Sequence, residues 1–335
     1  MKLKFFSCKR KRKRIGSSAH LPSRLLLSRW MSPDVAAWTP VRAPARTTSQ
    51  RWITSLAIAT TLAAVPVHSV RAQSSLQNFP LPQGERWLEV QHIDGSVTYH
   101  GDRQARPAQI GDRLLQLNQG IDTEIESGSI LQLDSNIGTV RVAESTSLRV
   151  NRMAVLPDGG RVTSLVIRRG QARLQVRRFT HPSSNLEIET PAGVAAIRGT
   201  VFGLSVENTG KTGVATLTGA VEVSAQGVSV MVNPGFATSV IPGYPPTPPR
   251  RIDRQLIFDL GSVQRTSSRV ILRGRVDPAN AVWIEGEEVE TDESGEFQTV
   301  LLNSPRRYFG TETLTVEVRN PLGERRVHPV AVPEF

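Results

Sequence analysis

Residues 186–204 read Leu-Glu-Ile-Glu-Thr-Pro-Ala-Gly-Val-Ala-Ala-Ile-Arg-Gly-Thr-Val-Phe-Gly-Leu. The first residues alternate between apolar and polar, which is the period-two pattern of a strand with one buried face. Proline cannot donate to a strand ladder, so Thr190-Pro191 predicts the end of that strand. Gly193 and Gly199 allow tight turns or a close approach of the backbone. We expect Arg198, which follows an apolar residue, to be half-buried and to hold carbonyl groups or an acid.

The same alternation recurs on both sides of this stretch. Turn signals rich in Asp, Asn, Ser and Gly separate the runs at intervals of roughly 8–12 residues. After residue 73, no run places apolar residues at the helical spacing i, i+3, i+4 and i+7. We therefore expect an all-β fold. Six further runs carry the pattern: 88–93, 129–133, 138–142, 148–150, 174–176 and 221–224.

Charge is distributed unevenly along the 335 residues, which hold 41 Lys+Arg and 30 Asp+Glu for a net charge of +11. Residues 1–72 contain 14 basic residues and one acid, whereas residues 73–335 contain 27 basic and 29 acidic residues. The larger segment is nearly neutral, which does not favour a nucleic-acid partner. The only cysteine, Cys8, lies in the first segment, so residues 73–335 hold no disulfide, thiolate metal site or cysteine nucleophile.

The first segment has the order of a secretory signal. Residues 53–70 carry no charged side chain, arginines precede them, and Val70-Arg71-Ala72 supplies small or short residues before the cut. We expect cleavage between Ala72 and Gln73, and therefore an exported protein in the periplasm or cell envelope of a bacterium. The alternative is that residues 53–70 remain as a membrane anchor, although they are weakly apolar for a span of roughly 20 residues.

Residues 1–30 add a basic run, 9–14, that resembles a nuclear signal or a nucleic-acid arm. We prefer the interpretation that translation starts at Met31, because residues 31–72 alone form a complete signal peptide. Residues 73–87 are polar and are expected to be a disordered lead-in.

Five prolines occupy residues 241–249 and predict an extended, semi-rigid spacer, so we place a linker at 241–250. Beyond it, about seven short alternating runs in residues 251–335 predict a small β-sandwich of immunoglobulin-like type. The match is architectural, because the Cys…Trp…Cys hallmark is absent.

The residues that could carry chemistry do not form a catalytic pattern. The histidines after Ala72, which are His92, His100, His181 and His328, have no metal-binding spacing and no neighbouring nucleophile motif. Gly199-Thr-Val-Phe-Gly203 lacks the lysine and helix of a phosphate loop. The sequence therefore predicts no catalytic residue, cofactor or metal, although a hydrolase that uses surface carboxylates is left open.

Two charge clusters stand out. Residues 161–178 hold six arginines and no acid, and the pattern predicts an exposed surface for an anionic partner such as envelope polymers or lipid head groups. We prefer the other interpretation, a solvated sheet face whose arginines pair across strands with Glu187, Glu189 or Glu207, because such faces are common. Residues 285–296 hold seven acids without a calcium-loop pattern and predict an acidic hairpin. The candidate anionic-partner surface comprises Arg168, Arg169, Arg173, Arg177 and Arg178.

Residues 188–204 resemble the core of FecR-type domains, and the resemblance extends over about 88–240. The later family strand is similar to residues 210–223, and the upstream parts are similar to 111–114, 121–123, 131–134 and 165–174. The residues that match the family core, to which we assign structural roles, are Thr190, Pro191, Arg198, Gly199, Thr200 and Phe202.

This resemblance implies a periplasmic domain built as a twisted, solenoid-like β-sheet that senses a receptor and passes the signal to an anti-sigma region. The chain departs from that plan, since an Arg/Pro/Ser-rich segment precedes residues 53–70 and a predicted sandwich follows the FecR-type part. We therefore expect an exported, non-catalytic module that binds an envelope protein or polysaccharide, with no nucleic-acid partner. The alternative is a membrane-anchored regulator of the FecR anti-sigma type, which would contact the membrane through its uncleaved leader.

Overall fold

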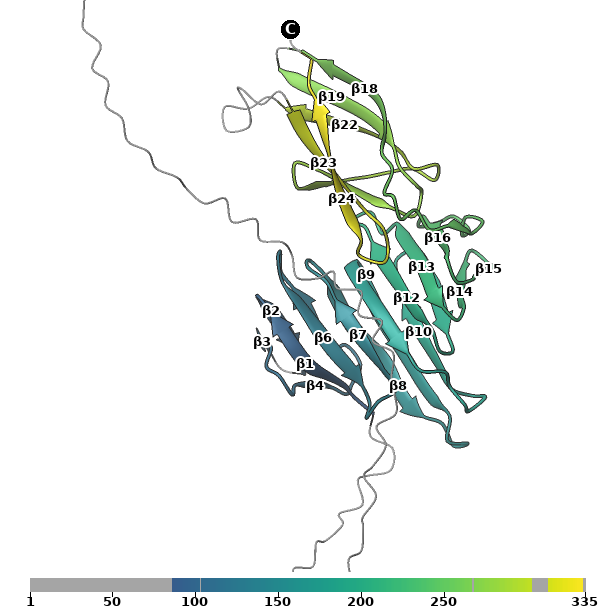
Figure 1. Cartoon of the computed structure of the whole chain (residues 1–335). Coiled ribbons are helices and arrows are strands. Elements are labelled where there is room, and N and C mark those ends of the chain that lie inside the picture. Colours follow the sequence, from purple (N-terminus) through teal and green to yellow (C-terminus); the bar gives the residue numbers. More distant parts are fainter. Residues whose placement is uncertain (1–85, 103, 267, 303–312, 334–335) are drawn as a thin grey trace, which may run out of the picture. The chain divides into compact units, whose positions relative to one another are not determined.

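A computed structural model describes residues 86–102, 104–266, 268–302 and 313–333. Every regular element of these residues is a strand, which confirms the all-β prediction (Figure 1). The leader, its cleavage site at Ala72–Gln73 and the start at Met31 lie outside the described residues. Within the described ranges, no helix is long and apolar enough to cross a membrane.

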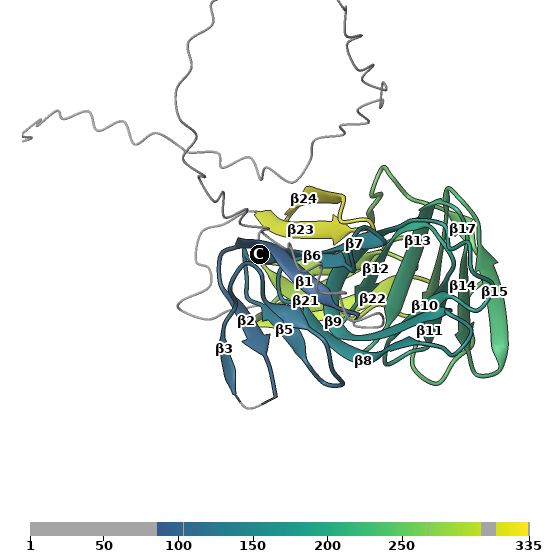
Figure 2. The ribbon, with the colours of Figure 1, turned by 90° about the horizontal axis from the view of Figure 1, so that it is seen from below.

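The FecR-type domain consists of two sheets that share one long strand, β9 (Arg161–Val176), and enclose one apolar core (Figure 2). Sheet A contains β1 (Leu88–Asp94), β4 (Arg113–Leu114), β6 (Gly128–Leu133), β7 (Gly138–Val142), the second half of β9, β12 (Val201–Val206), β13 (Thr212–Thr218), β16 (Phe236–Val240) and β17 (Arg250–Arg251). Sheet B contains β2 (Val97–His100), β3 (Ala105–Pro107), β5 (Gly120–Thr123), β8 (Ser147–Val155), the first half of β9, β10 (Asn185–Glu189), β11 (Val194–Ile197), β14 (Val221–Ala225) and β15 (Val228–Val232).

Strand β9 shows how one strand serves two sheets. Its residues up to Arg169 pair with β8, and from Gly170 onward they pair with β12 and, from Ala172, with β7. Gly170 has a φ of 91°, and a β-carbon there would lie 2.4 Å from the Cα of Thr146, so only glycine fits this crossing. The buried positions change from Leu165 and Ile167 to Leu174 and Val176. The alternation therefore shifts by one residue between the two halves of β9, and this shift keeps the apolar side chains on the core side of both sheets.

The sequence Arg198-Gly199-Thr200 carries the chain from β11 of sheet B to β12 of sheet A. Gly199 has a φ of 124°, and a β-carbon on it would lie 2.2 Å from the Cα of Arg178. Thr200 and Phe202 are buried directly after this corner. Four of the family-core residues, Arg198, Gly199, Thr200 and Phe202, therefore lie at the crossover between the two sheets.

Two details differ from the predicted domain ends. Arg86, expected in a disordered lead-in, is buried, and its guanidinium lies 2.9 Å from the carboxylate of Asp134. The proline-rich segment does not extend away as a spacer, because Thr247 donates its amide to Ser239 and β17 then pairs with β16. Prolines lack donors, but the threonine between them supplies the amide that returns the segment to sheet A.

Seven strands of the described residues beyond 258 form two further sheets. Sheet C has the order β18 (Asp259–Arg265), β19 (Arg269–Arg275), β22 (Glu296–Leu302), and sheet D the order β21 (Glu287–Val289), β20 (Ala281–Ile284), β23 (Thr313–Arg319), β24 (Arg325–Ala331). Buried residues of both sheets, including Leu272, Phe297 and Val316, form one core. The assignment of this domain to the immunoglobulin-like class stays a prediction.

Candidate functional site

The outer face of sheet A, which points away from the core, carries the features that suggest a function. Because side chains alternate along a strand, the residues between the core positions of β7, β9, β12 and β13 lie on this face. One part of the face presents arginines. The neighbouring part receives the C-terminal domain. We describe the two parts in turn.

The arginine part centres on a pair that belongs to two strands. Arg141 of β7 lies directly opposite Arg173 of β9 in the antiparallel register, and both side chains are exposed. Arg177 follows four residues after Arg173, is exposed, and donates its amide to the carbonyl of Ile137. We call these three residues the arginine strip. None of the three forms an ion pair within the described residues.

Other arginines of the same domain have carboxylate partners. Arg149 lies 2.8 Å from Asp122, and although burial alone would raise the pKa of Asp122, the bond from Arg149 lowers it to about 2. Further pairs join Arg86 with Asp134, Arg106 with Asp112, and Arg113 with Glu89. The arginine strip therefore differs from these paired residues in its environment and not in its residue type.

The predicted anionic-partner surface is only partly one surface. Arg168 is the extra residue of a bulge where β9 pairs with β8 of sheet B, whereas Arg173 lies on the outer face of sheet A. Arg169 and Arg178 are exposed near the two ends of the sheet A half of β9. A strand that serves two sheets presents its exposed side chains on two faces, so the sequence cluster is divided.

The glutamates that were candidate partners of these arginines have other contacts. Glu189 accepts a hydrogen bond from Ser164, and Glu187 accepts one from Asn185. Glu207 is paired with Lys211. Within the described residues, none of these glutamates forms an ion pair with an arginine of residues 161–178, whereas Arg161 pairs with Asp134.

The family-core residues outside the sheet crossover also have structural contacts. Thr190 closes the β10–β11 turn, since its Oγ1 accepts the amide of Gly193 at 3.2 Å, and Pro191 is exposed in that turn. Arg198 is exposed and not half-buried, although it does donate to a backbone carbonyl, that of Pro182. A long arginine can reach across the surface to a carbonyl without burial of its guanidinium.

The second part of the outer face is a joint with the C-terminal domain. A β-carbon on Gly203 would lie 2.2 Å from the carbonyl oxygen of Pro321, and one on Gly213 would lie 2.4 Å from that of Ala279. Beside these glycines, Ala215 and Ala237 pack with residues of the other domain in a small apolar cluster that includes Leu322. Small residues on β12, β13 and β16 thus allow the two backbones to touch.

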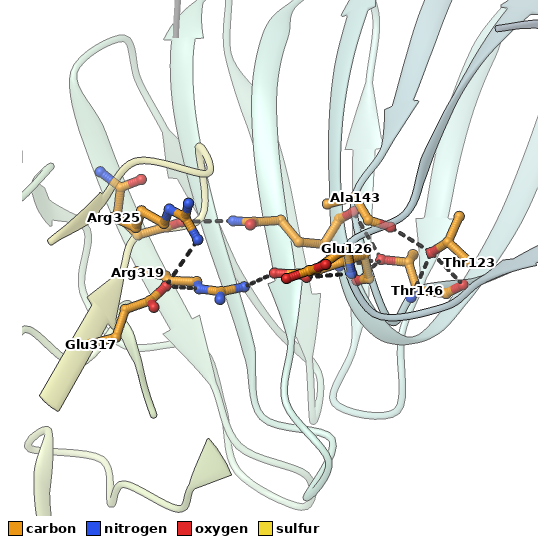
Figure 3. Close-up of polar contacts among 10 residues, drawn as sticks. Thr123, Glu126, Ala143, Thr146, Glu317, Arg319 and Arg325 are labelled. Carbon is orange, nitrogen blue, oxygen red and sulfur yellow. Dashed lines mark hydrogen bonds and ion pairs between the residues drawn. The ribbon is translucent and has the colours of Figure 1, made fainter. Parts of the chain in front are cut away.

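Polar contacts extend the joint (Figure 3). Gln171 donates from Nε2 to the carbonyl of Asn320 at 2.7 Å, and Arg319 lies 2.7 Å from Glu144. Arg319 is held by a second carboxylate, Glu317, and its guanidinium lies 4.4 Å from the ring centre of Trp283. Burial alone would raise the pKa of Glu144, but the amide of Glu126 and the charge of Arg319 hold it below its ordinary value. This ion pair joins the two domains.

A buried lysine lies at the same joint. Lys211 and Glu207 have side chains that are 2% and 5% exposed, and their charged atoms are 3.6 Å apart. Lys211 also donates to Thr291 of the C-terminal domain. Burial raises the pKa of Glu207 to about 7, the charge of Lys211 opposes this rise, and the nearby Glu288 and Glu290 add to it.

Part of the acidic segment, residues 285–296, contacts the FecR-type domain at the joint. Glu288 accepts the amide of Asn208 at 3.2 Å, and burial raises its pKa. Asp292 accepts hydrogen bonds from Ser294 and Glu296 within its own turn. Among the described residues, no group of His, Cys, Asp and Glu could hold a metal ion.

The residues of the joint were not found from the sequence, although one signal was present. Lys211 is the only lysine after Lys13, whereas every other basic residue in this part is an arginine. Gly203, Gly213 and Gln171 carry no local signal, because their partners are more than 60 residues away in the chain. Arg141 was missed because its neighbour in the strip lies on another strand.

Comparisons with known proteins agree with the sequence resemblance. Residues 121–222 match the family model described as FecR protein. Two crystal structures of a "putative anti-sigma factor" from Parabacteroides distasonis are similar at 16% and 17% sequence identity, each with a TM-score of 0.34. Each match covers 41% of this chain and 61% of that chain, so this chain spans about three fifths of the solved chains that it matches.

At that TM-score the structural likeness carries no argument, and no curated protein matches the sequence. The assignment depends on the family model and on the family-core residues, of which Arg198, Gly199, Thr200 and Phe202 lie at the crossover between sheets A and B. Residues 121–222 of the chain therefore form a domain that matches the FecR family model.

Proposed function

We propose that this chain is an exported, non-catalytic protein of a bacterial cell envelope that binds a protein or polysaccharide partner and takes part in envelope sensing. The observation that carries the proposal is the FecR-type domain matched at residues 121–222. The signal-like order of residues 42–72 supports export.

The joint supports a binding role for the two β domains as one unit. Backbone contact at Gly203 and Gly213, and the ion pair between Arg319 and Glu144, hold the C-terminal domain on sheet A. We propose that this domain is an immunoglobulin-like sandwich that takes the place of the receptor-contacting part of other FecR-type proteins. A partner that binds one domain would then also affect the other domain through the contacts of the joint.

Fractionation of a Gram-negative host that expresses the whole chain with a C-terminal tag tests export. We expect a soluble periplasmic form, and mass spectrometry should find Gln73 at its N-terminus. A membrane-bound form with residues 53–70 intact would contradict the proposal and favour the anchored anti-sigma type of regulator.

Capture of envelope components by the tagged chain tests the partner. Protease treatment of the extract should remove a protein partner, and glycan hydrolysis should remove a polysaccharide partner. Turnover of peptidoglycan or glucan by the purified chain would contradict the non-catalytic role and favour a hydrolase.

A further inference from the structure

The arginine strip is a charged surface that the fold leaves unneutralised. Arg141 and Arg173 are cross-strand neighbours. The Cβ atoms of such a pair lie about 5 Å apart. Two like charges in direct opposition destabilise a sheet unless an opposite charge lies close to both. No carboxylate of the described residues is paired with either.

The outward positions beside the strip on its own two strands are polar and uncharged, whereas on the flanking strands Ile130 lies opposite Arg141 and Gly203, at the joint, lies opposite Arg173. Thr139 and Gln175, which lie opposite each other beside the pair, separate Arg141 and Arg173 from Arg177. Outward positions of the flanking strands β6 and β12 carry no acid, and Glu89 on β1 is already bonded to Arg113. Arg173 and Arg177 are about 13 Å apart along the strand, at about 3.3 Å per residue. An extended polyanion could therefore meet several guanidinium groups at once.

The composition of this face favours one class of partner. Interfaces with proteins have an apolar or aromatic centre. The exposed large apolar residues of the described chain, such as Ile110, Ile125 and Leu302, do not belong to the outward positions of β7 or of the sheet A half of β9. Guanidinium, amide and hydroxyl groups instead match the carboxylates and hydroxyls of an acidic sugar chain.

We propose that the arginine strip, Arg141, Arg173 and Arg177, binds an anionic polysaccharide. The proposal deepens the proposed function, on which it rests, by naming the surface and the chemical class of the partner. Carboxylate or sulfate groups of the polysaccharide accept hydrogen bonds from the guanidinium groups, and its hydroxyls meet Thr139 and Gln175. Release of counterions makes such binding weaken with salt.

Arginine footprinting of the whole chain tests the proposal residue by residue. This readout is needed because the 14 basic residues of residues 1–72 would themselves bind a polyanion. The chain is treated with phenylglyoxal with and without polygalacturonate, and modification of each arginine is measured by mass spectrometry. We expect protection of Arg141, Arg173 and Arg177 at concentrations that leave Arg152 and Arg168 on β8 and β9 reactive.

Variants sharpen the test. Arg141→Gln with Arg173→Gln should raise the polygalacturonate concentration for half-protection of Arg177 about tenfold, as expected for lost charged hydrogen bonds. The matched control, Arg152→Gln with Arg168→Gln, removes the same charge near sheet B. It should change the polygalacturonate concentration for half-protection of Arg177 less than twofold. Cooperative melting at a temperature no lower than that of the unsubstituted chain would show that both variants are folded.

Several outcomes would overturn the proposal. These are absence of protection at low salt, equal protection of all exposed arginines, equal loss in both double variants, and equal protection by neutral dextran. Stronger protection by poly-L-glutamate, or by vesicles that contain phosphatidylglycerol, would overturn the polysaccharide class in favour of an acidic protein or a membrane. A chain that is not exported but shows the expected footprint would contradict the proposed function alone.

Discussion

At the joint, the guanidinium of Arg319 lies 2.7 Å from a carboxylate oxygen of Glu144, whereas on the neighbouring strands Arg141 and Arg173 lie opposite each other without a carboxylate. Of the cations of the joint, Lys211 is buried and Arg319 is partly buried, and each has an acid beside it. Those of the strip are exposed. A buried charge is strongly destabilising without a partner in the fold, whereas an exposed charge is solvated by water and remains free to bind a ligand. The difference separates residues that assemble the molecule from residues that are available for binding.

The largest effect on the free energy of unfolding should come from the buried pair of Lys211 and Glu207. We expect Lys211→Met to cost about 3 kcal/mol at about pH 8, because the carboxylate of Glu207 stays buried without its cation. The cost should shrink near pH 5.5, since burial raises the pKa of Glu207 to about 7 and a protonated carboxyl needs no cation. Chemical denaturation at both pH values measures the two free energies of unfolding.

A double-mutant cycle with Glu207→Gln provides the control. The neutral pair should be nearly as stable as the wild type at high pH. In the wild type, the raised folded pKa of Glu207 favours the folded state below the ordinary value of 4.5, and this stabilisation is lost as the pH rises through about 7. A cost of Lys211→Met that is the same at both pH values would contradict this account.

Gly203→Ala should disrupt the joint at its closest backbone contact. A β-carbon there would lie 2.2 Å from the carbonyl oxygen of Pro321, so the domains must move apart at a cost of about 2 kcal/mol. Calorimetry should show the unfolding transitions of the two domains becoming more separate. As a control, Gly261→Ala on β18 places its β-carbon 3.2 Å from the carbonyl oxygen of Arg273, a milder contact within one domain, and should cost clearly less.

Glu144→Gln should lower the stability by about 1 kcal/mol at about pH 7, because it removes the charge that faces the partly buried Arg319. The folded pKa of Glu144 lies below its ordinary value of 4.5, so the stabilisation is present above that value and is lost as the pH falls. Thermal unfolding curves of variant and wild type should therefore converge near pH 3. An equal loss in Glu222→Gln, an exposed residue of β14, would mean that the effect is not due to the joint.

The smallest effect on the free energy of unfolding should be a gain in stability and not a loss. Arg141→Gln should raise the stability by about 0.5 kcal/mol at low salt, because it removes a like-charge cross-strand contact. The gain should disappear at high salt, where the repulsion is screened. Arg149→Gln, which breaks a pair with Asp122, should instead destabilise the protein. A loss of stability in Arg141→Gln would mean that this arginine has a structural partner.

Local patterns predicted much of the fold and less of the site. The alternation in residues such as 186–190 and 221–224 corresponds to β10 and β14, and Thr190-Pro191 does end a strand. The arginines of residues 161–178 were correctly placed at exposed positions, but not on one face, because a phase change at Gly170 is a property of the sheet pairing. Arg198 was expected to be half-buried from its apolar neighbour alone, and that neighbour does not determine where a long side chain ends.

By itself, the sequence determined the all-β class, the FecR-type core and the uneven distribution of charge, because these depend on periodicity, motif and composition. Tertiary structure decided which charges meet. It placed Arg141 beside Arg173, buried Lys211 with Glu207, and brought Arg319 to Glu144 across 175 residues. Strand pairing and domain contact join residues that are distant in the chain, and no local pattern of the sequence records those distances.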